Sequence, residues 1–318
     1  MISLDVEEEG LFSGEYRGAG AGVDNARFLP RLLPLCRDLG YPLTLFCSWA
    51  VFNDAEAMRH VLRLRDEGSV EIGAHLHHWS TPPLEVGRDE RAEPQRTHLM
   101  PREALAAKLT TLFDAGREAT GERIVSFRMG RWDLKSELFP LLMGHGVEND
   151  CSIVPLRAFA DGADHFLAPP EPYWVSFPDG KRLLEIPVTQ IPPFAGMPRL
   201  WRKLCGNDAG KLDKFHYFGA LSCNPLWHSA PFMRLAARLL AARGGQVLSF
   251  FWHSSEMAPG GSPKIRSEAD QEKLLKKIYD FCAWLKENFD VEGKEARGLR
   301  DSGLNFPVHE AGGEGDWR

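Results

Sequence analysis

Short runs of consecutive apolar residues alternate along the chain with longer segments in which apolar positions recur at helical spacing. Such runs are typical of buried strands, and their alternation with helices is the pattern of a parallel α/β fold. The predicted strands are 2–6, 42–47, 70–74, 124–127, 146–153, 183–188 and 247–252, with a weaker one near Leu221. The predicted helices are 25–39, 54–67, 101–119, 133–143, 230–243 and 267–288.

The connections between these elements contain no internal repeat and no low-complexity linker. Residues 80–100 and 155–180 are rich in proline and polar or aromatic residues and are predicted to be loops, whereas 192–216 has no clear pattern. Because the strands are evenly spread, we expect one domain of about seven βα units over residues 1–290. A C-terminal tail, 291–318, is polar and rich in glycine, and its end is expected to be mobile.

Composition and charge exclude several classes of protein. Hydrophobic residues make up 43% and charged residues 26%, as in ordinary globular proteins. The formal net charge of −6 argues against a nucleic-acid partner and against binding to anionic membranes. No apolar stretch approaches the ~18 residues of a transmembrane helix. The first residues have neither the basic nor the apolar region of a signal peptide, so a cytoplasmic location is expected.

Polar residues directly follow several predicted strands, where α/β proteins place their reactive groups. After the first strand, Asp5 and Glu7 alternate with Val6 and therefore share one face of an extended chain. Two carboxylates on one face can bind a metal, or can divide into a base and a metal ligand. A solvated acidic segment is the simpler alternative.

Three histidines lie within four residues after the strand 70–74. In an extended chain His75 and His77 share a face, whereas in a helical turn His75 and His78 approach each other. Imidazole suits zinc, with a carboxylate as third ligand and an open position for water. Ordinary loop histidines are the alternative.

Two further residues with chemical potential follow later strands. Arg128, after the strand 124–127, can hold a carboxylate in its ionised form, or can form a purely structural ion pair. His253 follows the very apolar strand 247–252. In a closed barrel this last strand neighbours the first, which brings His253 near Asp5 as an acid, a base or a ligand. A buried core histidine is the alternative.

Taken in chain order, these motifs resemble those of the polysaccharide deacetylases of the NodB-homology family (carbohydrate esterase family 4). The resemblance covers about residues 1–257. The matching segments are Ser3-Leu4-Asp5-Val6-Glu7, Gly73-Ala74-His75-Leu76-His77, Phe127-Arg128-Met129-Gly130-Arg131-Trp132, Asn149-Asp150-Cys151-Ser152, Leu184-Glu185-Ile186-Pro187 and Trp252-His253-Ser254-Ser255-Glu256-Met257.

Two positions depart from the family pattern. Val6 stands where the family has its metal-binding second aspartate, so Glu7 is the better candidate ligand. The family's histidine ligands are four residues apart, but Trp79 stands four after His75. The second histidine is therefore His77 or His78, and the shared extended face favours His77.

The resemblance implies a single-domain α/β fold, a distorted (β/α)7 barrel of the NodB-homology type. It implies a hydrolase of non-peptide carbon–nitrogen bonds that removes an N-acetyl group from a sugar or glycan, with one divalent metal, preferably zinc. Another metal-assisted amide hydrolase and an inactive carbohydrate-binding relative are the alternatives. The implied roles are metal binding for Glu7, His75 and His77, catalysis for Asp5, Arg128 and His253, and substrate contact for Trp79, Trp132 and Arg131.

Overall fold

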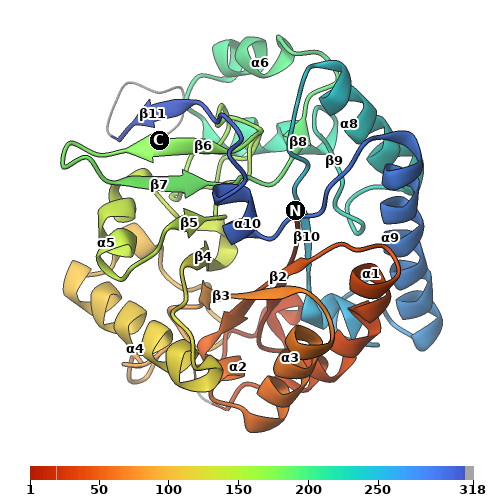
Figure 1. The fold of residues 1–318 in the computed structure, drawn as a ribbon. Helices are drawn as coiled ribbons and strands as arrows, with labels where there is room; N and C mark the ends of the chain where they lie inside the picture. Colours follow the sequence, from red (N-terminus) through yellow and green to blue (C-terminus); the bar gives the residue numbers. More distant parts are fainter. Residues whose placement is uncertain (19, 312–318) are drawn as a thin grey trace.

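A central, mostly parallel sheet organises the structure, a computed structural model that describes residues 1–18 and 20–311 (Figure 1). Its strand order is β10-β1-β2-β3-β4-β5-β7-β6-β11. Neighbours from β10 to β7 are parallel, β6 is antiparallel to β7, and β11 is parallel to β6. The strands are β1 (Ile2–Val6), β2 (Leu43–Ser48), β3 (Val70–Leu76), β4 (Ser126–Met129), β5 (Asn149–Asp150), β6 (Tyr173–Ser176), β7 (Arg182–Glu185), β10 (Phe250–His253) and β11 (Val308–Glu310). A separate two-stranded sheet pairs β8 (Gln190–Ile191) with β9 (Leu221–Ser222).

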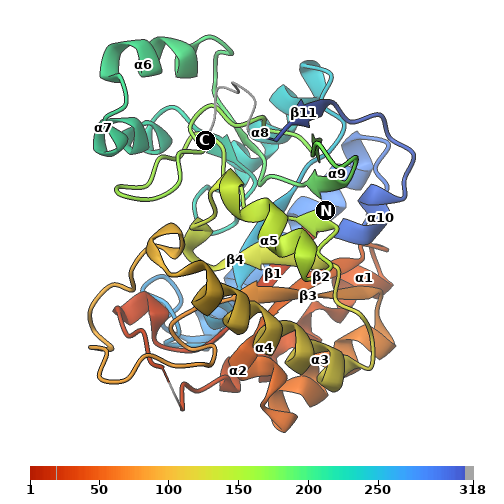
Figure 2. The ribbon, with the colours of Figure 1, turned by 90° about the vertical axis from the view of Figure 1, so that its left-hand side faces the viewer.

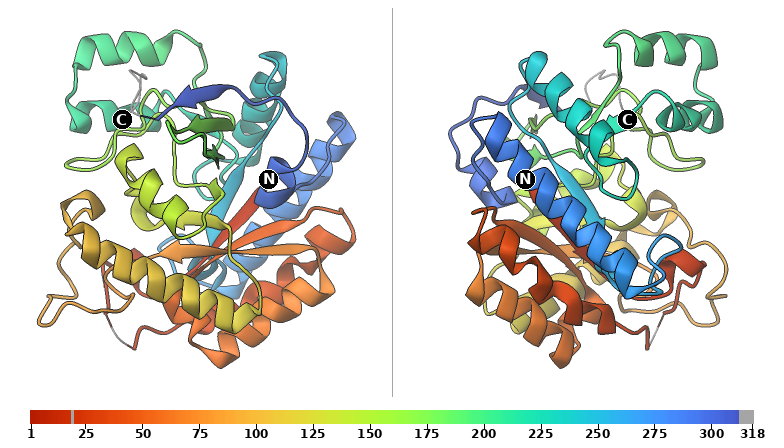
Figure 3. Two further views of the ribbon diagram at one scale, coloured as in Figure 1. Left: turned by 60° about the vertical axis from the view of Figure 1, so that its left-hand side comes forward. Right: turned by 90° about the vertical axis from the view of Figure 1, so that its right-hand side faces the viewer.

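Helices surround this sheet, with α4 on one side of the molecule and α8 and α9 on the opposite side (Figure 3). The helices are α1 (Leu33–Arg37), α2 (Trp49–Phe52), α3 (Ala55–Glu67), α4 (Arg102–Thr120), α5 (Phe139–Gly144), α6 (Met197–Cys205), α7 (Ala209–Asp213), α8 (Ala230–Ala242), α9 (Glu268–Asn288) and α10 (Ala296–Arg300). Local signals fix the ends of the long helices. Asp54 and Ser267 accept backbone N–H groups at the starts of α3 and α9, and Gly121 ends α4 in the left-handed conformation. In the described part of the chain, no helix is long and apolar enough to cross a membrane.

The predicted alternation of strands and helices is confirmed as a mixed α/β fold. Strands β1 and β2 are buried along their whole length, as expected for strands covered on both faces. The seven adjacent parallel strands, β10 to β7, match the predicted number of βα units. Closure into a barrel stays a prediction, because within the described residues β10 pairs with β1 alone.

Two predicted helices differ from the structure. Most of 25–39 is a 3-10 helix, Asp24–Leu32, which contains Pro30 and passes into the short helix α1. The helix predicted over 133–143 begins as α5 only at Phe139. Asp133, at the predicted start, does not begin the helix. Its carboxylate instead accepts the backbone N–H of Thr97 at 2.6 Å.

The far edge of the sheet combines segments that are distant in sequence. Strand β6 lies within 155–180, predicted to be a loop, and pairs with β7 and β11. Strand β11 and helix α10, with Ala296 and Leu299 buried, lie in the predicted tail 291–318. Residues of this segment therefore pack onto the sheet. The predicted mobile end, 312–318, lies outside the described residues.

Candidate active site

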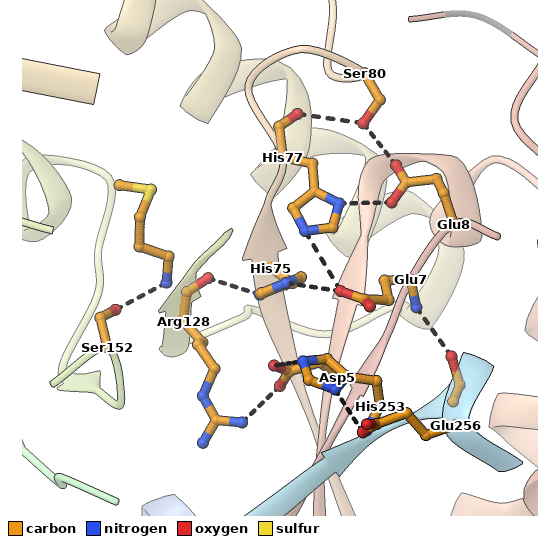
Figure 4. Close-up of polar contacts among 12 residues, drawn as sticks. Asp5, Glu7, Glu8, His75, His77, Ser80, Arg128, Ser152, His253 and Glu256 are labelled. Atoms are coloured by element: carbon orange, nitrogen blue, oxygen red, sulfur yellow. Dashed lines mark hydrogen bonds and ion pairs between the residues drawn. The ribbon is translucent and has the colours of Figure 1, made fainter. Parts of the chain in front are cut away.

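The strand register brings the predicted site residues together at one edge of the sheet. Asp5 lies opposite His253 in the ladder between β1 and β10, and His75 lies opposite Arg128 in the ladder between β3 and β4. Because these strands are parallel and adjacent in the sheet, their carboxyl ends meet. Figure 4 shows the imidazole rings of His75 and His77 both turned toward the Glu7 carboxylate.

Asp5 and Arg128 form a buried ion pair. Arg128 donates from Nη1 to Asp5 Oδ1 at 2.5 Å, from Nη2 to Ser3 Oγ at 2.8 Å, and from Nε to the Cys151 carbonyl at 2.9 Å. Burial opposes the charge of Asp5, but the Arg128 guanidinium and the neighbouring histidines hold the pKa of Asp5 below its usual value. Asp5 is therefore an oriented, ionised carboxylate.

Glu7, His75 and His77 form a compact trio of candidate metal ligands. The Nε2 atoms of His75 and His77 each lie 3.4 Å from Oε2 of Glu7. One ligand atom from each residue lies within 4.8 Å of the others, and all three residues are buried. Leu76, between the histidines, points into the apolar core, so the extended end of β3 places both rings on one face.

Hydrogen bonds behind the trio fix the orientation of both imidazoles. His75 Nδ1 donates to the Arg128 carbonyl at 3.0 Å, and His77 Nδ1 donates to Glu8 Oε2 at 2.7 Å. A ring that donates from Nδ1 keeps the Nε2 lone pair free for a cation. Burial opposes a charge on His77, but the carboxylates of Glu8, Glu7 and Asp5 raise its pKa. The trio therefore lies in a negative potential that favours a cation.

Glu8 is a further residue of the candidate site, one that the sequence analysis did not identify. Its second oxygen accepts from Ser80 Oγ at 2.6 Å. Burial favours the neutral form, but His77 and Ser80 hold the pKa of Glu8 at about 2. The run Glu7-Glu8-Glu9 was a signal that a second carboxylate lies near the first, but spacing does not show which carboxylate turns toward the histidines.

His78 lies outside the trio. Its Nε2 donates to the Gln95 carbonyl at 2.9 Å, and burial lowers the pKa of His78 to about 3. Of the two alternatives left open by the sequence, the geometry favours His77 as the second candidate ligand.

His253 lies at the open side of the site. Its Nε2 is 3.7 Å from Asp5 Oδ2, and its side chain is 19% exposed, against 2% for Asp5. Glu256 holds the ring by accepting from Nδ1 at 2.7 Å. Burial opposes the charge of His253, but Glu7, Glu256 and Asp5 together raise its pKa to about 10. The ring is therefore held in the protonated form with Nε2 facing Asp5.

The three predicted substrate contacts are placed differently from one another. Trp79 is only 3% exposed, and its ring stacks on the His77 ring with the ring centres 4.3 Å apart. It therefore lies against a candidate ligand and does not line the rim, contrary to expectation. Arg131 forms an ion pair with Glu93, with 2.5 Å between Nη2 and Oε1. Trp132 is partly exposed, with the Arg128 guanidinium 5.1 Å from its ring. Trp132 is thus the best placed of the three to meet a substrate.

Gly130 lies against His77 so closely that no side chain fits. A Cβ at this position would come within 2.3 Å of His77 Cδ2 and 2.5 Å of the Leu76 carbonyl. We expect Gly130→Ala to displace the His77 ring and to weaken zinc binding by about tenfold or more, measured by chelator competition. Gly144→Ala is the control, because its Cβ meets nothing within 4 Å. Equal zinc affinity in the two variants would contradict this contact.

The hydrogen bond between His77 and Glu8 is predicted to support metal binding. Glu8→Gln keeps the shape of the side chain but removes the charge that orients the imidazole, and we expect zinc affinity to fall about 10- to 100-fold. Glu9→Gln is the matched control in the same acidic run, since the Glu9 carboxylate accepts from the backbone of Asn25 instead. Isothermal titration of both variants checks this, and an equal loss in both would show that general negative charge suffices.

Comparison with known proteins supports the fold. No family model and no curated protein matches the chain. A solved structure from Mycobacterium smegmatis, assigned as a polysaccharide deacetylase, matches with a TM-score of 0.56 and 17% identity, over 96% of this chain and 91% of that one. At these values the likeness shows a shared fold.

Two glucan-processing enzymes share the fold as well. The 4-α-glucanotransferase of Thermococcus litoralis has a TM-score of 0.55 and 12% identity, over 98% of this chain. This chain spans only 42% of that enzyme's length. The GH57 branching enzyme of Thermococcus kodakaraensis has a TM-score of 0.52 and 10% identity, over 98% of this chain and 72% of that one. Because proteins with different activities share this fold, the reaction has to be inferred from the residues of the candidate site.

Proposed function

We propose that this chain is a metal-dependent deacetylase that hydrolyses the N-acetyl group of a sugar, in surface-polysaccharide or glycan metabolism. The observation that carries the proposal is the trio of Glu7, His75 and His77 beside the ion-paired Asp5 and the more open His253. The motif resemblance and the shared fold of one neighbour assigned as a polysaccharide deacetylase support it.

The donor set of the trio fits one divalent metal, with zinc as the first candidate. Two imidazole nitrogens and one carboxylate are the ligands of a hydrolytic zinc site that keeps a position for water. The hydrogen bonds on both Nδ1 atoms complete the usual support of such ligands. When bound, such an ion polarises a carbonyl and lowers the pKa of a water molecule.

The protein's own residues divide the proton transfers between them. Asp5, ionised and fixed by Arg128, accepts a proton from the water that attacks the acetamide carbon. The new carbon–oxygen bond forms and the carbon–nitrogen bond breaks. His253 donates its Nε2 proton to the departing nitrogen, because an amine is too basic to leave as an anion. The products are acetate and the free amino sugar.

The glucan chemistry of the other two neighbours fits this site less well. Glycosyl transfer with retention or inversion typically uses two carboxylates that flank the sugar bond. Here two imidazoles converge on Glu7, and Asp5 is ion-paired with Arg128. The residues at the site therefore favour hydrolysis of an amide.

Acetate release from a panel of N-acetylated sugars tests the proposal. Free sugars, nucleotide sugars and oligomers are incubated with zinc-supplemented protein, with Asp5→Asn as the control. We expect release from at least one class, and a rate about 10²- to 10⁴-fold lower for Asp5→Asn. Ring opening of cyclic amides without acetate release would indicate another amide hydrolase. Sugar binding without metal or turnover would indicate an inactive binding relative.

A further inference from the structure

Residues 194–218 form a small unit that projects from the rest of the molecule and contains α6 and α7 (Figure 2). An apolar core joins this unit to the loop that follows β5, with Phe166 of the loop packed against Leu212 and Phe215 of the unit. Helix α6 packs Met197, Trp201 and Cys205, four residues apart, against this core. One part of the apolar stripe of α6 is therefore packed.

The apolar stripe of α6 extends beyond the part that packs against this core. Leu200 and Leu204, one helical turn apart on α6, are 59% and 71% exposed. We define the α6 surface as the exposed apolar side chains of this unit, which are Phe194, Leu200, Leu204, Tyr217 and Phe218. They are five of the fourteen large apolar side chains that are exposed among the described residues. Contiguous apolar exposure of this kind marks an interaction site.

Ring packing joins the two parts of the α6 surface. Phe218 lies 5.2 Å from Trp201, ring centre to ring centre, and Leu204 is the neighbour of Trp201 one helical turn further along α6. The turn that follows α7 therefore continues the apolar stripe of α6. Met197, Trp201 and Cys205 pack against the core of the unit, whereas Leu200 and Leu204 beside them are exposed.

Positive charge accompanies the apolar side chains. Residues 194–218 contain five basic and two acidic residues, a net charge of +3 in a chain of −6. Lys203, beside Leu204, and Lys214, near Tyr217, are exposed. The charge of the whole chain argues against anionic membranes, but the local charge has the opposite sign.

Two ion pairs connect the unit to the loop that follows β5. Arg202 donates to both carboxylate oxygens of Asp164 at 2.7 Å, and Arg157 Nε lies 2.5 Å from Asp213 Oδ1. The same loop begins at Val154, which packs in one cluster with Phe251 and Trp132 beside the candidate active site. The α6 surface is thus fixed to a loop that starts at the catalytic edge.

We propose that the α6 surface docks on an anionic lipid bilayer. Leucine and aromatic side chains next to lysines are the composition of interfacial helices, in which apolar groups enter the headgroup region and cations pair with lipid phosphate. A symmetric contact between two copies fits less well, because it would bring the same cationic surface against itself. Docking would present the catalytic edge to sugars held at a bilayer, and this consequence alone rests on the proposed function.

Sedimentation with vesicles tests the docking without any substrate. Vesicles of phosphatidylcholine with about 30% phosphatidylglycerol are compared with phosphatidylcholine alone, at ionic strengths of about 0.05 and 0.5 M. We expect binding to the anionic vesicles, weakened by salt. Leu200→Gln/Leu204→Gln should lower the partition coefficient about tenfold or more, and Lys203→Gln/Lys214→Gln about tenfold on the anionic vesicles only. Leu235→Gln, an exposed leucine on α8, is the matched control and should bind like wild type.

Circular dichroism and light scattering separate docking from misfolding and self-association. Each variant should unfold at the wild-type temperature. The proposal is overturned if wild type stays in the supernatant with both vesicle types, if Leu235→Gln loses as much binding as the double leucine variant, or if the α6 variants change only the oligomeric mass. Vesicle binding by a protein that releases no acetate would overturn the proposed function and leave the docking intact.

Discussion

Replacement of His253 by alanine is expected to lower the turnover of an N-acetylated sugar by about 10²- to 10⁴-fold, while the metal content stays unchanged. His253 stands apart from the metal trio, with Nε2 3.7 Å from Asp5 and Nδ1 held by Glu256. Its protonated imidazole is the donor that the departing amine needs. Initial rates of acetate release and metal per chain, measured on the same samples, check the two parts of this prediction.

The outcomes of this experiment separate three roles of His253. His60→Ala is the control, since His60 lies on α3 and pairs with Glu56. Loss of metal together with activity would make His253 a ligand. Activity within a few-fold of wild type would contradict its role as general acid.

Replacement of either His75 or His77 by alanine is expected to lower zinc affinity by more than about 100-fold, beyond the effect of removing an outer contact. Each change removes one of three donor atoms that lie within 4.8 Å of one another. Metal per chain, after dialysis against a weak chelator, should fall from about one to near zero.

The neighbouring His78 provides a matched control for this prediction. It is buried like the two candidate ligands, but it is bonded to the Gln95 carbonyl. His78→Ala should therefore keep its metal, and thermal unfolding of all three variants shows whether burial alone explains a loss. If His78→Ala loses zinc and His77→Ala retains it, the assignment of ligands is wrong.

The sequence predicts the placement of Asp5, His75, Arg128 and His253 because each lies at the end of an apolar strand. Parallel pairing of β10, β1, β2, β3 and β4 then brings these ends together, whatever the loops do. Alternation along an extended chain also predicts that His75 and His77 face the same side. The structure agrees, because Nε2 of each ring lies 3.4 Å from Oε2 of Glu7.

Contacts that depend on other segments could not be predicted in this way. Trp79 follows the histidines and was a reasonable rim residue, but its ring covers His77, which only the three-dimensional path of the loop decides. The fit of Gly130 against His77 arises between two strands. Likewise, β6 and β11 are recognisable as strands only because residues 173–176 and 308–310 pair across the chain.

Helix α6 illustrates a different limit, because residues 192–216 show no clear pattern in the sequence. The apolar positions of α6 (197, 200, 201, 204 and 205) lie on one stripe of a helix, part of it packed on Phe215 and Leu212 and part of it exposed. The helix is only 9 residues long and ends before Gly206, so it is shorter than the window of about 11 to 18 residues in which helical periodicity is recognised.

Anomalous X-ray diffraction at the zinc absorption edge, from crystals of the zinc-bound protein, tests the central claim most directly. We predict one anomalous peak bounded by Nε2 of His75, Nε2 of His77 and the carboxylate of Glu7, with Asp5 close by but paired with Arg128. A peak held by His78 or His253, or no peak at the trio with zinc in excess, would contradict the proposed metal centre.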